Sequence, residues 1–222
     1  MCGRFALAVE KHVLEMLFQL ELRGEFSFRY NIAPAQEILA VRISPQHGGR
    51  EAVMLKWGLV PHWARDESIG ARLINARSET AAEKPVFREA FKQRRILIPA
   101  SGFYEWKTEP AGKQPYFIGM KGGRPFALAG LWESRRRESG QLESCTVLTT
   151  APNSLVAQMH NRMPVIVPEE AYAAWLDPQS GRAALEALAA APYPEDLMTA
   201  RPVSRLVNSP ANDHPGLIAP LE

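Results

Sequence analysis

Residues 94–134 read RRILIPASGFYEWKTEPAGKQPYFIGMKGGRPFALAGLWES, and this stretch decides the fold class. It holds four short runs rich in apolar, β-branched and aromatic residues, namely RRILIPA, GFYEWK, PYFIGM and PFALAGLWES. Residues that favour turns separate the runs, such as the KGGRP between Met120 and Phe126. Runs of this kind predict consecutive β-strands joined by short connections.

Similar runs occur on both sides of this stretch. They are EILAVRI (37–43), EAVMLKWGLV (51–60) and SCTVLTT (144–150). Helical spacing of apolar residues instead marks residues 6–20, the segment 79–91 interrupted at Pro85, residues 153–161 with Asn153 as N-cap, and residues 169–176 and 181–190. Many short strands with helices at the margins predict a strand-dominated α+β fold. Because no repeat or linker divides the sequence, we expect a single domain over residues 1–222.

The composition is that of an ordinary soluble protein, with 46% hydrophobic and 23% charged residues. No apolar stretch approaches the ~20 residues that a membrane-spanning helix needs. Charges at Arg4, Glu10 and Lys11 interrupt the region where a signal peptide is apolar. We therefore expect a cytoplasmic protein with no membrane partner. In that reducing compartment Cys2 and Cys145 are expected to stay unbonded, and the scattered histidines predict neither a metal nor a cofactor.

Charge is unevenly distributed although the net charge is only +2. From Lys56 to Lys107 there are ten basic and six acidic residues, whereas residues 168–222 hold three basic and eight acidic ones. Arginine supplies 19 of the 26 basic residues, and its planar guanidinium suits phosphate binding. This pattern predicts a polarised surface. A compositional bias towards arginine explains the excess equally well.

Cys2 is the first candidate for chemistry. Its small side chain makes Met1 a target for removal, which leaves an α-amine with a pKa of about 7.7–8.0 beside a thiol of about 8.5. An aldehyde condenses with the amine to an imine, and the thiol then closes a five-membered thiazolidine ring. Gly3 lets the backbone approach a ligand, and Arg4 brings a cation that binds phosphate and favours the thiolate. The plainer alternative is a small residue that happens to follow the initiator.

Three further segments carry candidate polar residues. In RLINARSET, period-2 spacing presents Asn75, to orient an amine or a sugar hydroxyl, and Arg77, to hold a phosphate. In IPASGFYEWK, aromatic neighbours are expected to raise the pKa of Glu105 into the range of a general acid or base. In TTAPNSLVAQMHNRMPVIV, His160 is a natural proton shuttle at the end of a short helix. The plainer alternatives are a polar loop with a helix cap, a solvent-facing glutamate and a structural histidine.

Two tryptophans bracket the segment WGLVPHW. Trp57 lies inside an apolar run and is expected in the core, whereas Trp63, beside His62 and Arg65, is the better platform for stacking a base. Cys145 lies in SCTVLTT and is expected to be a buried small hydrophobe.

Seven blocks, in order from residue 2 to about residue 210, resemble the SRAP family of SOS response-associated peptidases, or abasic-site processing proteins. They are MCGRF, YNIAP, WGLVPHWA, INARSET, GFYEWK, HNRMPVI and VSRLVNSP. The resemblance implies a barrel-like antiparallel β core flanked by helices and, as partner, single-stranded DNA that contains abasic sites. A monomer is expected because no apolar seam stands out.

The resemblance also implies that Cys2, after loss of Met1, forms a thiazolidine with the ring-opened deoxyribose aldehyde. Asn75, Glu105 and His160 match the family's other catalytic positions. The candidates for DNA contact are Arg4, Arg77, Arg162, Ser78, Trp63, Trp106 and Thr149. The peptidase label refers to removal of Met1, and the imine stage allows weak lyase activity. Two alternatives stay open: a cysteine hydrolase that uses Cys2, His160 and Glu105, and a non-catalytic single-strand binding module.

Overall fold

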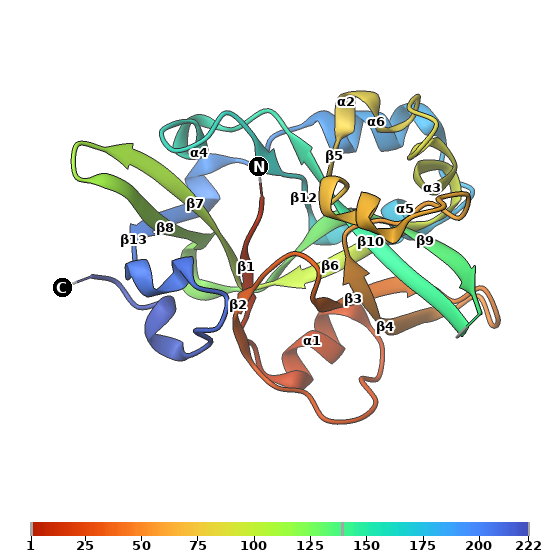
Figure 1. The fold of residues 1–222 in the computed structure, drawn as a ribbon, viewed down its shortest axis with the longest axis horizontal. Coiled ribbons are helices and arrows are strands. Elements are labelled where there is room, and N and C mark those ends of the chain that lie inside the picture. Colours follow the sequence, from red (N-terminus) through yellow and green to blue (C-terminus); the bar gives the residue numbers. More distant parts are fainter. Residues whose placement is uncertain (1, 139, 222) are drawn as a thin grey trace.

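The computed structural model describes residues 2–138 and 140–221, whose strands form two sheets (Figure 1). The larger sheet closes into a barrel, because β9 pairs with β6 and β10 while β10 also pairs with β4. The order around the barrel is β10 (Gly140–Thr150), β4 (Arg50–Trp57), β3 (Glu37–Ile43), β6 (Arg95–Ala100) and β9 (Phe126–Arg137). Only the β10–β4 pair is parallel among these neighbours. The expected strand-dominated α+β fold with a barrel-like core is confirmed.

Three short strands extend the barrel at β10 and β9. They are β5 (Asn75–Arg77), β11 (Met163–Pro164) and β12 (Ile166–Val167). β5 runs parallel to β10 with Arg77 opposite Thr149, and β11 pairs with the same residue through Pro164. The end of β10 therefore gathers two segments that are far apart in the sequence.

The smaller sheet is antiparallel. Its strand β1 (Phe5–Leu7), near the beginning of the chain, lies between two other strands rather than at an edge. The order of the sheet is β13 (Met198–Pro202), β8 (Gly112–Met120), β7 (Gly102–Glu109), β1 and β2 (Arg29–Ile32). The two sheets share one hydrophobic core, in which Phe5 and Phe103 of this sheet lie with Trp57 and Ile98 of the barrel. The ring centroids of Phe5 and Trp57 are 5.4 Å apart.

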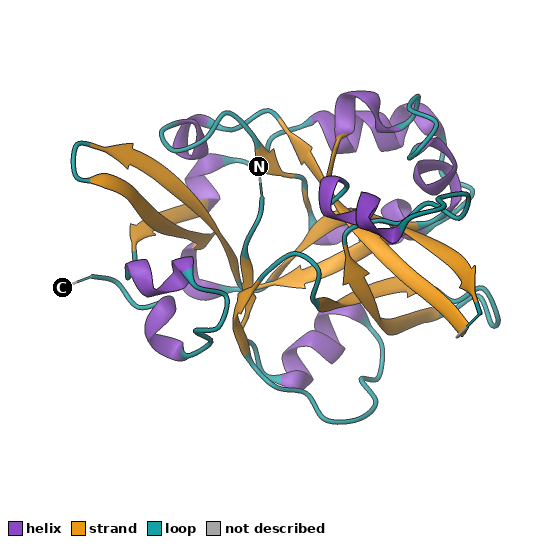
Figure 2. Cartoon of the chain, viewed as in Figure 1, coloured by secondary structure: helices purple, strands orange, loops and turns teal. Residues whose placement is uncertain are grey.

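Helices lie at the margins of the sheets (Figure 2). They are α1 (Lys11–Phe18), α2 (Ser78–Ala81), α3 (Arg88–Gln93), α4 (Ser154–Ala157), α5 (Tyr172–Leu176) and α6 (Arg182–Ala190). The expected break around Pro85 is confirmed, since it separates α2 from α3. The expected N-cap is also confirmed, because the Asn153 side chain accepts a hydrogen bond of 3.0 Å from the Val156 N–H. Among the described residues, no helix is both long and apolar enough to cross a membrane.

The prediction of one helix over residues 6–20 is wrong at its N-terminal end. Residues 5–7 form β1, and the helix covers only Lys11–Phe18. All three residues of β1 are buried, and the strand pairs with β7 on one edge and β2 on the other. These long-range pairings outweigh the local helical spacing of the apolar residues.

Gly130 is required where three barrel strands approach closely. A Cβ at this position would lie 2.8 Å from the side chains of Ile96 and Ile98 on β6 and 3.0 Å from the carbonyl oxygen of Thr146 on β10. Trp57 and Cys145 are completely buried in the same core, as expected from the sequence. The barrel thus leaves no room for a side chain at residue 130.

Gly130→Ala is expected to destabilise the protein by about 1–3 kcal/mol, the usual cost of adding a methyl group to a tightly packed core. Urea unfolding at equilibrium measures the change. Gly181→Ala is the control, because a Cβ there meets nothing within 4 Å. Equal stability of the two variants would contradict the packing argument.

Candidate active site

Cys2 lies just before β1 and is completely buried. Its carbonyl oxygen accepts a hydrogen bond of 2.8 Å from Nδ2 of Asn75. Burial raises the pKa of the Cys2 thiol to about 12, and the charge of Glu105 acts in the same direction. The thiol is therefore protonated at neutral pH in this structure, although a backbone hydrogen bond from Arg4 acts in the opposite direction, towards the thiolate.

Asn75 is the first residue of β5, and its backbone lies opposite Val147 of β10. Its Nδ2 donates the hydrogen bond to the Cys2 carbonyl oxygen. Its Oδ1 is buried and has no hydrogen-bond partner among the described residues. A buried acceptor without a donor is costly. The amide is thus arranged to accept an N–H from a group that arrives beside Cys2.

Glu105 lies on β7, opposite Tyr116 of β8, and is only 3% exposed. Burial raises its pKa to about 7. The raised pKa expected from the sequence is confirmed, although its cause is loss of solvent around the whole residue. A carboxyl group with this pKa exchanges protons readily near neutrality.

His160 lies beyond α4 in a loop, not within the helix, and its N–H still donates to the carbonyl of Val156. The backbone N–H of Arg162 lies 3.0 Å from Nδ1 and donates to it. Burial lowers the pKa of His160, and the charges of Arg162 and Lys113 lower it further. The imidazole is therefore neutral at pH 7, and its proton lies on Nε2 because Nδ1 accepts the hydrogen bond.

Two of the three arginines proposed for phosphate contact are engaged within the chain. Nη1 of Arg4 donates to Oδ1 of Asn31 and to the carbonyl of Val207, both at 2.6 Å. Nη2 of Arg162 donates to Oε2 of Glu79 at 2.8 Å, and Nη1 and Nη2 also contact Oε1 of Glu79 and the carbonyl of Thr149.

The other DNA-contact candidates differ widely in exposure. Arg77 is exposed and Trp63 is 56% exposed, so both are accessible to a ligand. Trp106 is half-buried, and its Nε1 donates a hydrogen bond of 2.8 Å to Oδ1 of Asn208. Ser78 and Thr149 are buried and accessible to a ligand only if neighbouring side chains move.

A cavity of about 440 Å³ opens at Glu105, whose charge acts on the buried thiol of Cys2. The residues that line it are Glu105, Trp106, Lys113, His160 and Asn208. The structure thus brings Glu105 and His160 to one cavity and ties Asn75 to Cys2, while Trp63 does not line this space. The four residues expected to be catalytic form one neighbourhood, which joins a buried thiol, an amide, a carboxyl group and an imidazole.

Comparison with known proteins assigns the chain to a family. The family model described as SOS response associated peptidase (SRAP) matches residues 1–210. The chain belongs to the SRAP family. The "Abasic site processing protein YoqW" of Bacillus subtilis is 43% identical to this SRAP chain over 98% of its length and 99% of the relative's. YedK of Escherichia coli, which carries the same description, is 30% identical over the full length of both chains.

Solved structures show that the fold of this SRAP chain is shared. A crystal structure of a protein from Bacteroides thetaiotaomicron matches it with a TM-score of 0.87 and 25% identity over the whole of both chains. One from Bordetella bronchiseptica matches with a TM-score of 0.79 and 27% identity over 91% of this chain and all of the other.

Several residues that shape the site of this SRAP chain were not predicted from the sequence. Asn31, Glu79 and Asn208 lie inside the blocks YNIAP, INARSET and VSRLVNSP, so the blocks themselves were the available signal. Lys113 lies in the turn-rich stretch KTEPAGKQP, where nothing in the sequence distinguishes it from a surface lysine.

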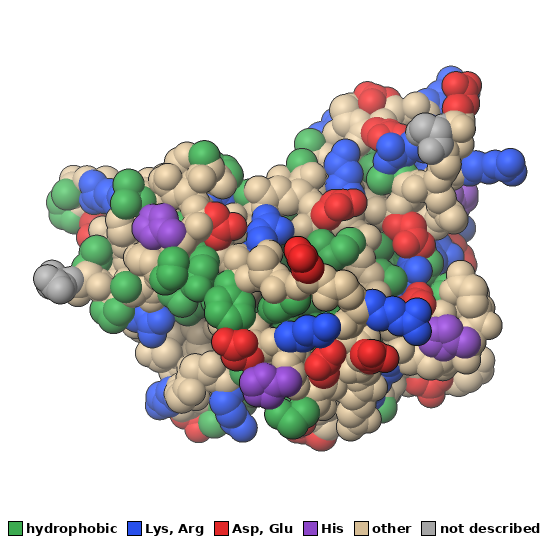
Figure 3. Space-filling view, turned by 90° about the horizontal axis from the view of Figure 1, so that it is seen from below, with side chains coloured by type: hydrophobic (Ala, Val, Ile, Leu, Met, Phe, Trp, Pro, Cys, Tyr) green, Lys and Arg blue, Asp and Glu red, His purple; other side chains and the backbone are tan. Residues whose placement is uncertain are grey.

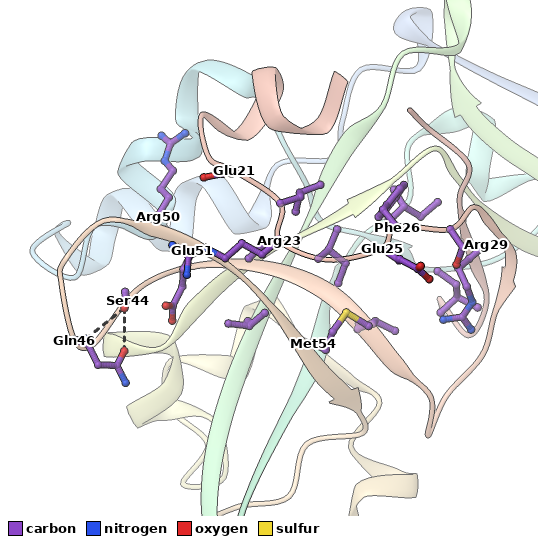
Figure 4. Close-up of a pocket in the computed structure, with 18 of the residues that line it drawn as sticks. Glu21, Arg23, Glu25, Phe26, Arg29, Ser44, Gln46, Arg50, Glu51 and Met54 are labelled. Carbon is purple, nitrogen blue, oxygen red and sulfur yellow. Dashed lines mark hydrogen bonds between the residues drawn. The ribbon is translucent and has the colours of Figure 1, made fainter. Parts of the chain in front are cut away.

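A larger cavity, of about 750 Å³, lies away from these residues (Figure 4). The segment 21–29 and the β3–β4 hairpin line it, and apolar side chains such as Leu39 and Val53 form part of its wall. Its charged residues have both signs: Glu21, Glu25 and Glu51 with Arg23, Arg29 and Arg50. None of the candidate site residues lines it, so cavity size alone does not mark the site.

The surface of this SRAP chain is mixed in charge on the face shown in Figure 3, where Lys and Arg side chains are interspersed with Asp and Glu. The polarised surface expected from the sequence is therefore absent from this face.

Glu105→Gln is expected to alter how stability depends on pH. The folded pKa of about 7 lies above the ordinary 4.5, so the unfolded chain releases this proton first as the pH rises. The wild type therefore loses stability between about pH 4.5 and 7, by on the order of 3 kcal/mol. Glutamine has no proton to release, so urea unfolding across this range should show a flatter profile for the variant.

Glu109→Gln, at the far end of the same strand, is the matched control and should follow the wild-type profile. Parallel profiles for Glu105→Gln and the wild type would contradict a buried carboxyl group with a raised pKa.

Proposed function

We propose that this protein processes abasic sites by capturing them covalently in single-stranded DNA. In this proposal Met1 is removed, and the α-amine and thiol of Cys2 form a thiazolidine with the aldehyde of the opened deoxyribose. The observation that carries the proposal is the hydrogen bond from Asn75 to the Cys2 carbonyl, with an unused buried Oδ1 and a buried Glu105 beside it. Curated relatives described as abasic site processing proteins support it.

The reaction begins with opening of the sugar ring. The carboxylate of Glu105 takes the proton of the C1′ hydroxyl as the C1′–O4′ bond breaks, while Nε2–H of His160 hydrogen-bonds to O4′. Glu105 then delivers that proton to O4′, so the neutral imidazole keeps its own proton and both side chains return to their starting forms. The hydrogen bond from the Arg162 N–H to Nδ1 supports this role, because it leaves Nε2 as the donor nitrogen. One proton thus passes from O1′ to O4′, and an aldehyde remains at C1′.

The amine attacks before the thiol does. An α-amine has a pKa of about 7.7–8.0 and is partly unprotonated near neutrality, whereas burial raises the pKa of the thiol to about 12. The amine adds to C1′, and loss of one water gives the imine. The S–H then adds across the C=N bond: sulfur bonds to C1′, and the proton reaches nitrogen by way of Glu105. The sequence is balanced without an oxidant or a cofactor.

The DNA strand is held by cations around this centre. Arg77 is exposed and ready to meet a phosphate, and Arg162 does so when Glu79 yields or shares the guanidinium. Trp106 and Trp63 offer apolar faces to neighbouring nucleotides. We further propose that the protein acts as a monomer in the cytoplasm, associates with the nucleoid when bound to DNA, and has weak lyase activity through the imine.

A cysteine hydrolase is the less favoured function. Such an enzyme needs a thiolate, usually in contact with an imidazole. The thiol of Cys2 is fully buried with a pKa raised to about 12, and Glu105 disfavours its ionisation. A reaction that starts at the α-amine avoids this cost.

Intact mass spectrometry of the purified protein with a single-stranded oligonucleotide containing one abasic site tests the proposal. We expect the chain to lack Met1 and the adduct to weigh the sum of both partners less one water. Cys2→Ala should give no stable adduct, because an imine without the thiol reverses. Wild-type protein that lacks Met1 and still forms no adduct would sink the proposal.

Glu105→Gln should slow adduct formation by about 10²-fold or more, the common scale of general acid–base catalysis. In the wild type the rate should rise as the pH approaches about 7, because the carboxylate is the active form. Quenched time courses of adduct formation across this pH range measure both effects. The Glu109→Gln control should keep the wild-type rate, and an unchanged rate in Glu105→Gln would remove Glu105 from the mechanism.

A further inference from the structure

We propose that Lys113 binds the backbone phosphate next to the abasic sugar and so sets the path of the strand across the cavity beside Cys2. This inference rests on the proposed function and adds a residue to it. Lys113 lies on β8, in a stretch that no sequence motif distinguishes, and it lines the same cavity as Glu105 and His160.

The cavity needs a cation if an anionic strand is to enter it. Glu105 contributes a carboxyl group that is ionised above about pH 7 and then repels phosphate. Among the described residues that line the cavity, Lys113 is the one side chain with a permanent positive charge. Its charge already acts on His160 across this space, which agrees with its position at the cavity.

Lys113 is also available, unlike two of the arginines. Arg4 is bound to Asn31 and Val207, and Arg162 is bound to Glu79. Lys113 is exposed and forms no salt bridge within the described part of the chain. A phosphate that binds it therefore breaks no salt bridge among these residues.

The register of the β7–β8 hairpin places Lys113 near the indole of Trp106. Lys113 lies opposite Thr108 and Pro115 lies opposite Trp106, so Lys113 and Trp106 occupy the same face of the β7–β8 hairpin. Diagonal neighbours of this kind are about 7–8 Å apart. The hydrogen bond from Trp106 to Asn208 holds the indole in place. A nucleotide that packs against the indole can thus bring its phosphate to Lys113.

The test separates binding from chemistry by using single-stranded DNA with a tetrahydrofuran abasic analogue, which has no aldehyde to capture. Lys113→Ala should bind it about tenfold more weakly at low salt. The slope of log K against log salt should become shallower by about 0.7, the value for one phosphate contact in a single strand. Lys113→Arg should retain most of the affinity and the slope.

Lys107→Ala is the matched control. Lys107 lies on the same hairpin opposite Gln114, on the other face from Lys113, and does not line the cavity. Its removal should leave the salt slope unchanged. If Lys113→Ala and Lys107→Ala give equal affinities and slopes, Lys113 is not a phosphate contact.

Adduct formation with true abasic DNA supplies the second readout. Lys113→Ala should raise the DNA concentration for half-maximal rate by about tenfold and change the maximal rate little, because Lys113 holds the strand and moves no proton. A drop in the maximal rate alone would overturn the assignment. Failure of the wild type to form any adduct would refute the proposed function, whereas the salt slopes on the analogue would still decide the role of Lys113.

Discussion

The hydrogen bond from the Asn75 side chain to the Cys2 carbonyl joins the beginning of the chain to the barrel, and the site is built around it. The pairing of β5 with β10 holds Asn75 in place. The pairing of β1 with β7 and β2 holds the segment that carries Cys2. Because Cys2 is completely buried, loss of this bond would leave its carbonyl without a partner in a dry environment. The position of the Cys2 backbone is therefore fixed by both sheets at once.

The burial that fixes Cys2 also decides which of its groups reacts first. Removal of water disfavours the charged forms of the thiol and of Glu105, and each negative charge would disfavour the other. A site that relied on a thiolate would have to overcome both effects. A site that begins with a neutral amine needs only one base of moderate strength, and Glu105 with a pKa of about 7 has that strength. The order of bond formation in the proposed mechanism thus follows from desolvation.

Local patterns in the sequence predicted most of the strands, because buried runs such as residues 95–100 and 144–150 are bounded by turn-forming residues. They failed at β1, whose three residues share the apolar spacing of the following helix and become a strand only through their partners. The membership of Cys2, Asn75, Glu105 and His160 in one site came from a family resemblance, since spacing along the chain does not report proximity. The burial that raises the pKa of the Cys2 thiol was not predicted, because solvent exclusion depends on the packed fold.

Local sequence patterns also could not predict the interactions of the arginines, because each arginine and its partners are far apart along the chain. Arg4 pairs with Asn31 and Val207, which lie 27 and 203 positions away, and Arg162 pairs with Glu79, 83 positions away. Each arginine lies in a block that identified it as a cation near the site. The blocks also contain these partners, but nothing in them pairs a given arginine with its acceptor.

These internal partners change how the protein would select its ligand. The guanidinium of an arginine that is paired with a carboxylate is already oriented. When such an arginine binds a phosphate, its side chain loses less than the roughly 2 kcal/mol of conformational entropy that a free arginine carries. The same carboxylate cancels the charge, and with a net charge of +2 the chain attracts undamaged strands only weakly. If the proposed function holds, discrimination rests on the two steps that undamaged DNA fails: entry of a sugar without its base into the cavity beside Cys2, and condensation of an aldehyde with the amine. A site that depends on fit and covalent chemistry gains more from paired, oriented arginines than from a strongly basic surface.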